Sequence, residues 1–321
     1  MTSLLSHPAE TIAAAHARIA PFVHRTPVLT SRRIDAIVGA SVWFKGENFQ
    51  KVGAFKARGA FNAVLSLSDA EAGAGVVTHS SGNHAAALAL AAATRGIPAY
   101  IVMPRTASEI KKAAVAGYGA EITFCEPTLA AREAAAAEIQ ARIGARMVPP
   151  YDDDAVIAGQ STAAVELIQE VPGLEIVTCP VGGGGLMAGA ALATRWLEPE
   201  ARVIAAEPTG ADDAWRSFTS GVRVKQTDPE TIADGLLTSL GERNFAVMMA
   251  CVDDVLTVTD PGIIEAMRLI WTSMKIIVEP SAAVPLAAML EHPDVFAGRR
   301  VGMILSGGNV DLDRLPWVVG A

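Results

Sequence analysis

The sequence lacks the features that mark secreted, membrane-spanning or nucleic-acid-binding proteins. Its 321 residues include only 3 cysteines, 5% aromatic residues and 19% charged residues. Cys125, Cys179 and Cys251 are far apart and odd in number, which is typical of reduced thiols rather than of a disulfide framework or a zinc site. No apolar run reaches the ~18 residues of a membrane helix, and the N-terminus does not resemble a signal peptide. The net charge of −8 without a basic run disfavours nucleic-acid binding, so we expect a cytoplasmic protein without nucleic-acid or membrane partners.

Short apolar runs alternate with alanine-rich helical segments along most of the chain, which predicts parallel sheets with crossover helices. The expected strands are 42–45, 75–78, 99–103, 121–124, 175–179, 202–206, 254–258 and 300–305. The segment Pro149–Asp154 interrupts this alternation with two prolines and three acidic residues. We therefore predict a large domain from residues 1–50 and 151–321, with a small domain of residues 51–150 inserted in it. Residues 208–234 give no clear pattern and are predicted as a surface excursion.

Lys56 stands in the stretch Phe49–Asn62, between Phe55 and a helix-favouring run. A lysine amine with its ordinary pKa of about 10.4 is a poor nucleophile, but desolvation lowers that pKa and permits a Schiff base with a carbonyl cofactor. An isolated lysine is more often a solvated helix residue. Lys56 is thus a candidate reactive group that needs support from the other motifs.

Four glycines, Gly182–Gly185, separate an expected strand from an expected helix. Such a turn offers backbone N–H groups and a helix dipole to an anion, and glycines let the main chain wrap a phosphate. The spacing is not GxGxxG, yet a dinucleotide site or a tight turn without ligand remains open on this motif alone.

Three further motifs carry polar groups at the ends of strands. The run Ser80–His84 precedes a helix and suits a substrate carboxylate, although Ser80 could be an N-cap and His84 a structural histidine. Ser306 follows the last strand, where a turn serine is the alternative. The acidic turn Glu207–Asp213 offers the hard oxygen ligands that Mg²⁺ or Ca²⁺ prefers, although acidic loops are usually only solvated.

The four blocks 51–62, 78–84, 180–185 and 305–309 occur in the order found in the fold-type II pyridoxal-phosphate enzymes. Within that group the chain resembles the serine racemase and serine/threonine dehydratase family, which includes 3-hydroxyaspartate dehydratases. The resemblance implies two open, twisted, mostly parallel sheets with flanking helices, an active site between the domains, and a homodimer. It implies pyridoxal 5'-phosphate bound to Lys56.

The resemblance also implies roles for individual positions. Gly182, Gly183, Gly184 and Gly185 would hold the cofactor phosphate, Ser306 would face the pyridine nitrogen, and Asn83 would bond the ring oxygen. Phe55 and Gly235 would lie beside the cofactor. The substrate-binding positions would be Ser80, Ser81, Asn83, His84 and Arg132. The ligands of Mg²⁺ (or Ca²⁺ or Mn²⁺) would be Glu207, the carbonyl of Ala211, and Asp213.

These positions predict elimination of water from a β-hydroxy amino acid such as serine, threonine or 3-hydroxyaspartate, giving a 2-oxo acid or imine and ammonia. A hydroxyl at Ser306 makes the bound ring a weaker electron sink than a carboxylate would, which suits elimination and racemisation better than transamination. The alternative is an amino-acid racemase in which Lys56 and Ser81 act on opposite faces of the substrate. A β-replacement synthase and a non-catalytic nucleotide-binding protein are the remaining hypotheses, and His79 with Arg132 would be candidates for a second substrate carboxylate.

Overall fold

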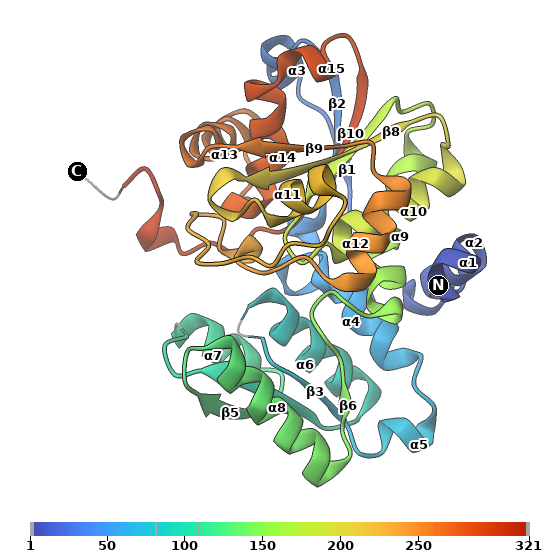
Figure 1. Cartoon of the computed structure of the whole chain (residues 1–321), viewed down its shortest axis with the longest axis vertical. Helices are drawn as coiled ribbons and strands as arrows, with labels where there is room; N and C mark the ends of the chain where they lie inside the picture. Colours follow the sequence, from blue (N-terminus) through green and yellow to red (C-terminus); the bar gives the residue numbers. More distant parts are fainter. Residues whose placement is uncertain (1–2, 81, 108, 319–321) are drawn as a thin grey trace.

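The computed structural model describes residues 3–80, 82–107 and 109–318, and its strands form two separate sheets (Figure 1). Within these residues the larger sheet has six strands in the order β1-β2-β10-β7-β8-β9. Its strands are β1 (Val28–Leu29), β2 (Ser41–Gly46), β7 (Ile176–Pro180), β8 (Arg202–Pro208), β9 (Asp254–Val258) and β10 (Arg300–Leu305). All neighbours are parallel except β1, which is antiparallel to β2. The carboxyl ends of β2, β7, β8 and β10 therefore meet at one edge.

The smaller sheet has four strands, in the order β5-β4-β3-β6, and every pair in it is parallel. Its strands are β3 (Val76–Thr78), β4 (Ala99–Pro104), β5 (Glu121–Cys125) and β6 (Arg146–Met147). Strands that are parallel need crossover connections, and the helices that supply them cover both faces. The prediction of two open, mostly parallel sheets with flanking helices is confirmed.

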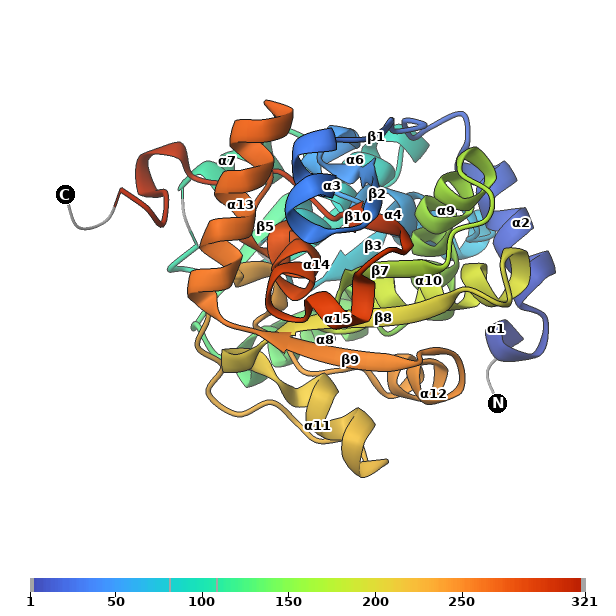
Figure 2. The ribbon, with the colours of Figure 1, turned by 90° about the horizontal axis from the view of Figure 1, so that it is seen from above.

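Helices cover both faces of the larger sheet, as the view from above shows (Figure 2). One layer packs with a hydrophobic cluster built around Phe44, Ile263 and Leu286. It contains α3 (Arg32–Val38), α13 (Asp260–Met274), α14 (Pro280–Glu291) and α15 (Pro293–Phe296). The opposite layer packs with a cluster that includes Ile157 and Leu186. It contains α1 (Ser3–Ser6), α2 (Pro8–Ile19), α9 (Asp154–Glu170), α10 (Gly185–Leu197), α11 (Asp213–Ser220) and α12 (Glu242–Cys251).

The smaller sheet is also covered on both faces. One cluster joins α4, α6 and α7 to β3 and β4, and a smaller cluster around Ala136 and Ile139 places α8 on the other face. These helices, with the short α5, are α4 (Lys56–Leu65), α5 (Asp69–Ala72), α6 (Asn83–Arg95), α7 (Glu109–Ala116) and α8 (Leu129–Ile143). Short 3₁₀ turns complete the chain: η1 (Glu47–Phe49), η2 (Lys51–Gly53), η3 (Thr209–Ala211), η4 (Asp234–Leu236) and η5 (Leu312–Arg314).

Local sequence explains where many of these helices begin and end. Pro8 occupies the first turn of α2, where its missing N–H costs nothing. The Thr128 side chain accepts from the Ala131 N–H at the start of α8, and Gly144 ends that helix with φ of 81°, a conformation that glycine adopts readily. The Asp153 carboxylate caps α9 by accepting from the N–H groups of Ala155 and Val156. One of the three acids in the Pro149–Asp154 segment thus starts a helix.

The eight strands expected from the sequence correspond to β2–β5 and β7–β10; β9 and β10 have the expected ends, and the others are shifted by at most two residues. The two that were missed, β1 and β6, have two residues each and carry no detectable alternation. Helices α3, α11 and α12 were also missed, and α11 lies inside the 208–234 stretch that was predicted as a surface excursion. The domain boundaries at residues 50 and 151 stay a prediction. No helix in the described part of the chain is long and apolar enough to span a bilayer.

A buried ionic cluster connects helix α4 to the larger sheet. Arg58 has no exposed side-chain surface, and its Nε lies 2.8 Å from a Glu47 oxygen while its Nη1 lies 2.8 Å from a Glu166 oxygen. Lys45, which is also fully buried, donates from Nζ to Glu166 at 2.7 Å. Although burial opposes it, hydrogen bonds from His16 and Arg58 hold the pKa of Glu166 well below its ordinary value. This cluster fixes the helix whose first residue is Lys56.

Candidate active site

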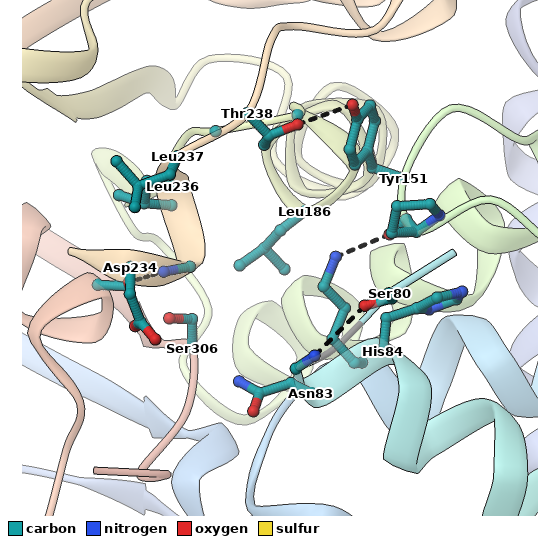
Figure 3. A pocket seen from close by; sticks show the side chains of 18 of the residues that line it. Ser80, Asn83, His84, Tyr151, Leu186, Asp234, Leu236, Leu237, Thr238 and Ser306 are labelled. Atoms are coloured by element: carbon teal, nitrogen blue, oxygen red, sulfur yellow. Dashed lines mark hydrogen bonds between the residues drawn. The ribbon is translucent and has the colours of Figure 1, made fainter. Parts of the chain in front are cut away.

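A cavity of about 240 Å³ opens where loops from both sheets meet (Figure 3). Its wall is built by the loop after β3, the glycine loop after β7, the loop after β10, and the start of α4. Ligand sites of parallel α/β sheets lie beyond the carboxyl ends of strands, and this cavity has that position. Twelve predicted site residues line it: Phe55, Lys56, Ser80, Asn83, His84, Arg132, Gly182, Gly183, Gly184, Gly185, Gly235 and Ser306.

Lys56 begins α4 and extends its amine into the cavity. The Nζ donates a hydrogen bond to the Pro150 carbonyl at 2.7 Å and lies 5.0 Å from the centre of the Phe55 ring. Burial lowers the pKa of Lys56 to about 8, and the charge of Glu279 opposes this shift only in part. Near neutral pH a much larger fraction of this amine is unprotonated than in a solvated lysine, so it can act as a nucleophile or a base.

The glycine loop Gly182–Gly185 has no room for side chains. An added Cβ at Gly183 would lie 2.3 Å from the Tyr151 ring, and one at Gly184 would lie 2.6 Å from Leu240. Gly184 also has φ of 89°, which disfavours other residues. Helix α10 begins at Gly185, so its first-turn N–H groups have no partner within the helix. A backbone cradle at a helix N-terminus fits a phosphate group.

Ser306 and Gly235 lie on other parts of the same wall. Ser306 directly follows β10 and is 2% exposed, and its carbonyl accepts from the Phe55 N–H at 3.0 Å. This bond ties the loop before Lys56 to the end of the strand. The Gly235 N–H donates to the Ser281 hydroxyl at 3.1 Å, which fixes the backbone of η4 at the cavity.

Asn83 is held at both ends of its amide. Its Nδ2 lies 3.2 Å from both carboxylate oxygens of Glu279, and its Oδ1 accepts from Asn309 Nδ2 at 2.9 Å. Burial raises the pKa of Glu279 to about 7, and the charge of Asp234 adds to that shift. Nδ2 carries a second hydrogen, so Asn83 can still donate to a ligand while Glu279 orients it.

The segment that runs from the loop after β3 into α6 contains three further predicted substrate-binding residues. Ser80 points into the cavity beside Asn83 (Figure 3), and its hydroxyl accepts from the Gly82 N–H at 3.5 Å. Ser81 lies outside the described residues. His84 is 2% exposed and donates from Nε2 to the Val148 carbonyl at 3.0 Å. Burial lowers the pKa of His84 to about 3, so the ring is neutral and is anchored as a structural histidine would be.

Several residues of the cavity wall were not among the predicted site residues. Tyr151 packs under Gly183 and shares a 2.8 Å hydrogen bond with Thr238 (Figure 3). Asn309 belongs to the block 305–309 and could have been chosen from it. Lys111 on α7 pairs with Asp234 at 3.0 Å and both residues line the cavity, and nothing in the local sequence of either residue indicates this contact.

The predicted metal ligands form a separate cluster that does not line the cavity. Glu207 is fully buried and accepts from the N–H groups of Ala214 and Trp215 at 3.0 and 2.8 Å. Asp213, also fully buried, accepts from the Leu240 N–H at 2.7 Å through Oδ2. Its Oδ1 is buried without a hydrogen-bond partner among the described residues.

Charge is poorly compensated in this cluster. Burial raises the pKa of Glu207 well above its ordinary value and that of Asp213 to about 6, and repulsion from neighbouring acids adds to both shifts. No group of three or more metal-binding side chains occurs in the part of the chain that the structure describes. A cation here would need a main-chain oxygen as well, and the buried Ala211 stands between the two acids in sequence. The two carboxylates with an unpartnered oxygen fit a hard cation.

Comparisons with known proteins give one consistent result. Residues 19–307 match the model of the family described as pyridoxal-phosphate dependent enzyme. The chain is 52% identical over 308 residues to a beta-hydroxyaspartate dehydratase of Paracoccus denitrificans, covering 96% of this chain and 98% of that protein. It is 48% identical to an L-threo-3-hydroxyaspartate ammonia-lyase of Saccharomyces cerevisiae, covering 94% and 93%. The solved structure of maize serine racemase superposes with a TM-score of 0.93 at 46% identity, covering 95% of this chain and 94% of that one.

Proposed function

Because this chain belongs to the family of pyridoxal-phosphate dependent enzymes, we propose that it eliminates water from a β-hydroxy amino acid and releases a 2-oxo acid and ammonia. Family membership makes the chain an enzyme, so the hypothesis of a non-catalytic nucleotide-binding protein no longer applies. The observation that carries the proposal is the Lys56 amine, which has a pKa of about 8 and lies in one cavity with a glycine cradle and Ser306. The similarity to a beta-hydroxyaspartate dehydratase and to an L-threo-3-hydroxyaspartate ammonia-lyase supports elimination over other reactions of the family.

The wall of the cavity fits the cofactor. Gly182–Gly185 would hold the phosphate, Ser306 would face the ring nitrogen, and the free hydrogen of Asn83 would meet the ring oxygen. Phe55 and the backbone of Gly235 would line the remaining sides. When bound, pyridoxal phosphate supplies an aldehyde for the substrate amine and a conjugated ring that stabilises negative charge at Cα.

The residues of the chain supply binding and proton transfer. The N-terminus of α6 and the Ser80 hydroxyl would bind the α-carboxylate. Lys56 would leave the Pro150 carbonyl and accept the Cα proton at Nζ. The Cα–H and Cβ–O bonds break, a Cα–Cβ double bond forms, and Lys56 would pass the Cα proton to the departing β-hydroxyl, which leaves as water. Hydrolysis of the product then gives the 2-oxo acid and ammonia.

Racemisation is the second candidate, and the 46% identical maize serine racemase favours it. It would need a second proton donor on the face opposite Lys56, for which Ser81 is the proposed residue. We further propose that the enzyme is a homodimer, as the family resemblance implies, and that it is cytoplasmic. Its domains would divide at residues 50 and 151, where Pro149–Asp154 interrupts the alternation of strands and helices. The buried pair of Glu207 and Asp213 supports a Mg²⁺ site completed by the Ala211 carbonyl, with a structural rather than a catalytic role.

The test is the absorbance of the purified protein with pyridoxal phosphate, followed by product analysis with L-serine, L-threonine and the threo and erythro forms of 3-hydroxyaspartate. A band of bound cofactor should disappear in Lys56→Ala, and formation of 2-oxo acid should fall by about 10³-fold or more, because nucleophile and base are one residue. Lys225→Ala, which removes an exposed lysine outside the cavity, is the matched control. If only the opposite enantiomer accumulates, the racemase is the correct function; if no cofactor band forms, the role of Lys56 is wrong.

A further inference from the structure

The backbone carbonyl of Gly183 belongs to a loop whose N–H groups would bind an anion. A carbonyl oxygen carries a partial negative charge, so it must be directed away from a bound phosphate. The Gly183 carbonyl accepts two hydrogen bonds, one from Asn244 Nδ2 at 2.6 Å and one from the Gly241 N–H at 3.1 Å. Of these three residues only Gly183 lines the cavity. The carbonyl therefore points into the protein and leaves the cavity to the N–H groups.

Asn244, in the first turn of α12, makes this contact at a cost to the fold. Its side chain is fully buried, and its Oδ1 has no hydrogen-bond partner among the described residues. A buried acceptor without a partner lowers stability, and an apolar side chain of similar size would avoid this loss. The amide at this position therefore indicates a function that depends on the Nδ2 hydrogen bonds and that packing alone would not supply.

The same amide also contacts the segment that holds the reactive amine. Asn244 Nδ2 lies 3.3 Å from the carbonyl of Tyr151, and the preceding Pro150 carbonyl accepts from the Lys56 amine at 2.7 Å. The carboxylate of Asp152 accepts from the first two N–H groups of α12, at 3.1 and 2.9 Å. The start of α12 thus connects the glycine loop to the backbone beside Lys56. A cofactor with phosphate and aldehyde at a fixed covalent distance binds best when the two parts of its site are held at that distance.

We propose that Asn244 is a positioning residue of the cofactor site. It holds the Gly183 carbonyl away from the phosphate, and it fixes the glycine loop relative to the segment beside Lys56. This inference rests on the proposed function, because the ligand of the loop is taken to be the phosphate of pyridoxal phosphate. Asn244 acts through the backbone of Gly183 and Tyr151 and does not itself line the cavity. Its loss should weaken binding of the phosphate group and spare binding of the aldehyde.

The first experiment compares the dissociation constants of pyridoxal 5'-phosphate and of pyridoxal, which lacks the phosphate. Asn244→Leu keeps the approximate size of the side chain and removes its hydrogen bonds. The dissociation constant of pyridoxal phosphate should rise by about tenfold or more in this variant, and that of pyridoxal should change by less than about threefold. The absorbance of the bound cofactor measures both constants. A general loss of stability would not separate the two ligands in this way.

Asn62→Leu is the matched control. Asn62 is 2% exposed, and its Nδ2 donates to the Ala155 carbonyl at 2.7 Å, outside the cavity wall. This variant should lower the melting temperature and leave the ratio of the two dissociation constants within about threefold of the wild-type ratio. If Asn244→Leu does not fold, Asn244→Ala leaves space for a water molecule and gives the same comparison, with an expected rise of about fivefold or more for pyridoxal phosphate.

The second experiment is independent of Lys56. Binding of inorganic phosphate to the cofactor-free protein is measured by calorimetry. Wild type and Asn62→Leu should bind phosphate alike, and Asn244→Leu should bind it about tenfold more weakly or worse.

The outcomes separate the role of Asn244 from the proposed function. If Asn244→Leu keeps the wild-type ratio of the two dissociation constants, or if Asn62→Leu lowers it equally, the positioning role is wrong while the cofactor site stands. If neither pyridoxal compound binds to wild type but phosphate binding depends on Asn244, the proposed function fails and the role of Asn244 in the glycine loop is retained. If inorganic phosphate binds to wild type no better than to Asn244→Leu, that role is overturned whatever the activity.

Discussion

Two arginines of this protein lie in opposite electrostatic environments. Arg58 is enclosed by Glu47 and Glu166, and every contact between them is about 2.8 Å long. Arg132 reaches the cavity wall and has no carboxylate partner among the described residues. Arg58 is satisfied by the fold itself, whereas Arg132 has unused hydrogen-bonding capacity in the free protein.

The same contrast extends to the residues around each arginine. In the ionic cluster, Lys45 and Arg58 offset the two buried glutamates, and α4 and α9 are thereby held together. At the cavity, Lys56 has a lowered pKa and Glu279 a raised one, so the fold disfavours the charged form of both. Functional sites commonly keep such perturbed groups because a ligand uses them, whereas structural clusters pair their charges.

The largest expected effect comes from breaking the satisfied cluster. Arg58→Met leaves Glu47 and Glu166 buried without their shared partner, and the free energy of unfolding should fall by about 3–5 kcal/mol. Arg132→Met removes a buried donor without a partner, so that free energy should stay the same or rise, by up to about 1–3 kcal/mol. Urea denaturation of both variants measures the difference. Equal losses in the two variants would mean that Arg132 is also structural and would weaken its assignment to substrate.

The acidic cluster of Glu207 and Asp213 shares features with both arginines. Like Arg58 it is fully buried, and like Arg132 it has a polar atom without a partner among the described residues, which is Oδ1 of Asp213. We expect Mg²⁺ to complete it. At a concentration 100 times the dissociation constant, Mg²⁺ should stabilise the wild type by about 2.7 kcal/mol against unfolding. In Asp213→Asn this stabilisation should be lost, while Asp294→Asn, in the short helix α15, should retain it. Thermal unfolding with Mg²⁺ and with a chelator checks the prediction, and an unchanged melting temperature in wild type would contradict it.

The sequence predicted most of the framework and twelve of the 26 residues that line the cavity, for a physical reason. Strand, loop and helix alternate regularly, and the ends of parallel strands meet at one edge, so motifs that follow strands converge in space. Lys56, the four glycines and Ser306 could therefore be placed from sequence alone. Short strands such as β6, and pairs such as Lys111 with Asp234, depend on tertiary contacts between distant segments, and local patterns carry no signal for them.

The ionic cluster escaped prediction for the same reason. Lys45, Glu47, Arg58 and Glu166 come from separate elements, and only their packing reveals that these charges are buried. The role of Glu279 could not be predicted from its local sequence for a different reason. It stands before Pro280 at the start of α14, a position that explains an acidic residue without any ligand. Its contact with Asn83 is visible only when both segments are in place.

The smallest expected effect concerns the energetic cost that burial imposes on the Lys56 charge. Its pKa is about 8 in the folded protein against an ordinary 10.5, so between these values the unfolded chain binds a proton that the folded protein has released. The contribution of Lys56 to the free energy of unfolding therefore rises with pH between pH 8 and 10.5. Below pH 8 both states carry the proton, and Lys56 lowers the stability of the fold by a constant amount. Between pH 8 and 9.5 the free energy of unfolding of the wild type should increase by about 1–2 kcal/mol relative to that of Lys56→Met.

Urea denaturation of the cofactor-free proteins at several pH values measures this difference, with Lys225→Met as control. Parallel curves for wild type and Lys56→Met would mean that the folded protein solvates this amine fully. The contrast between the paired ionic cluster and the cavity would then depend on Arg132 and Glu279.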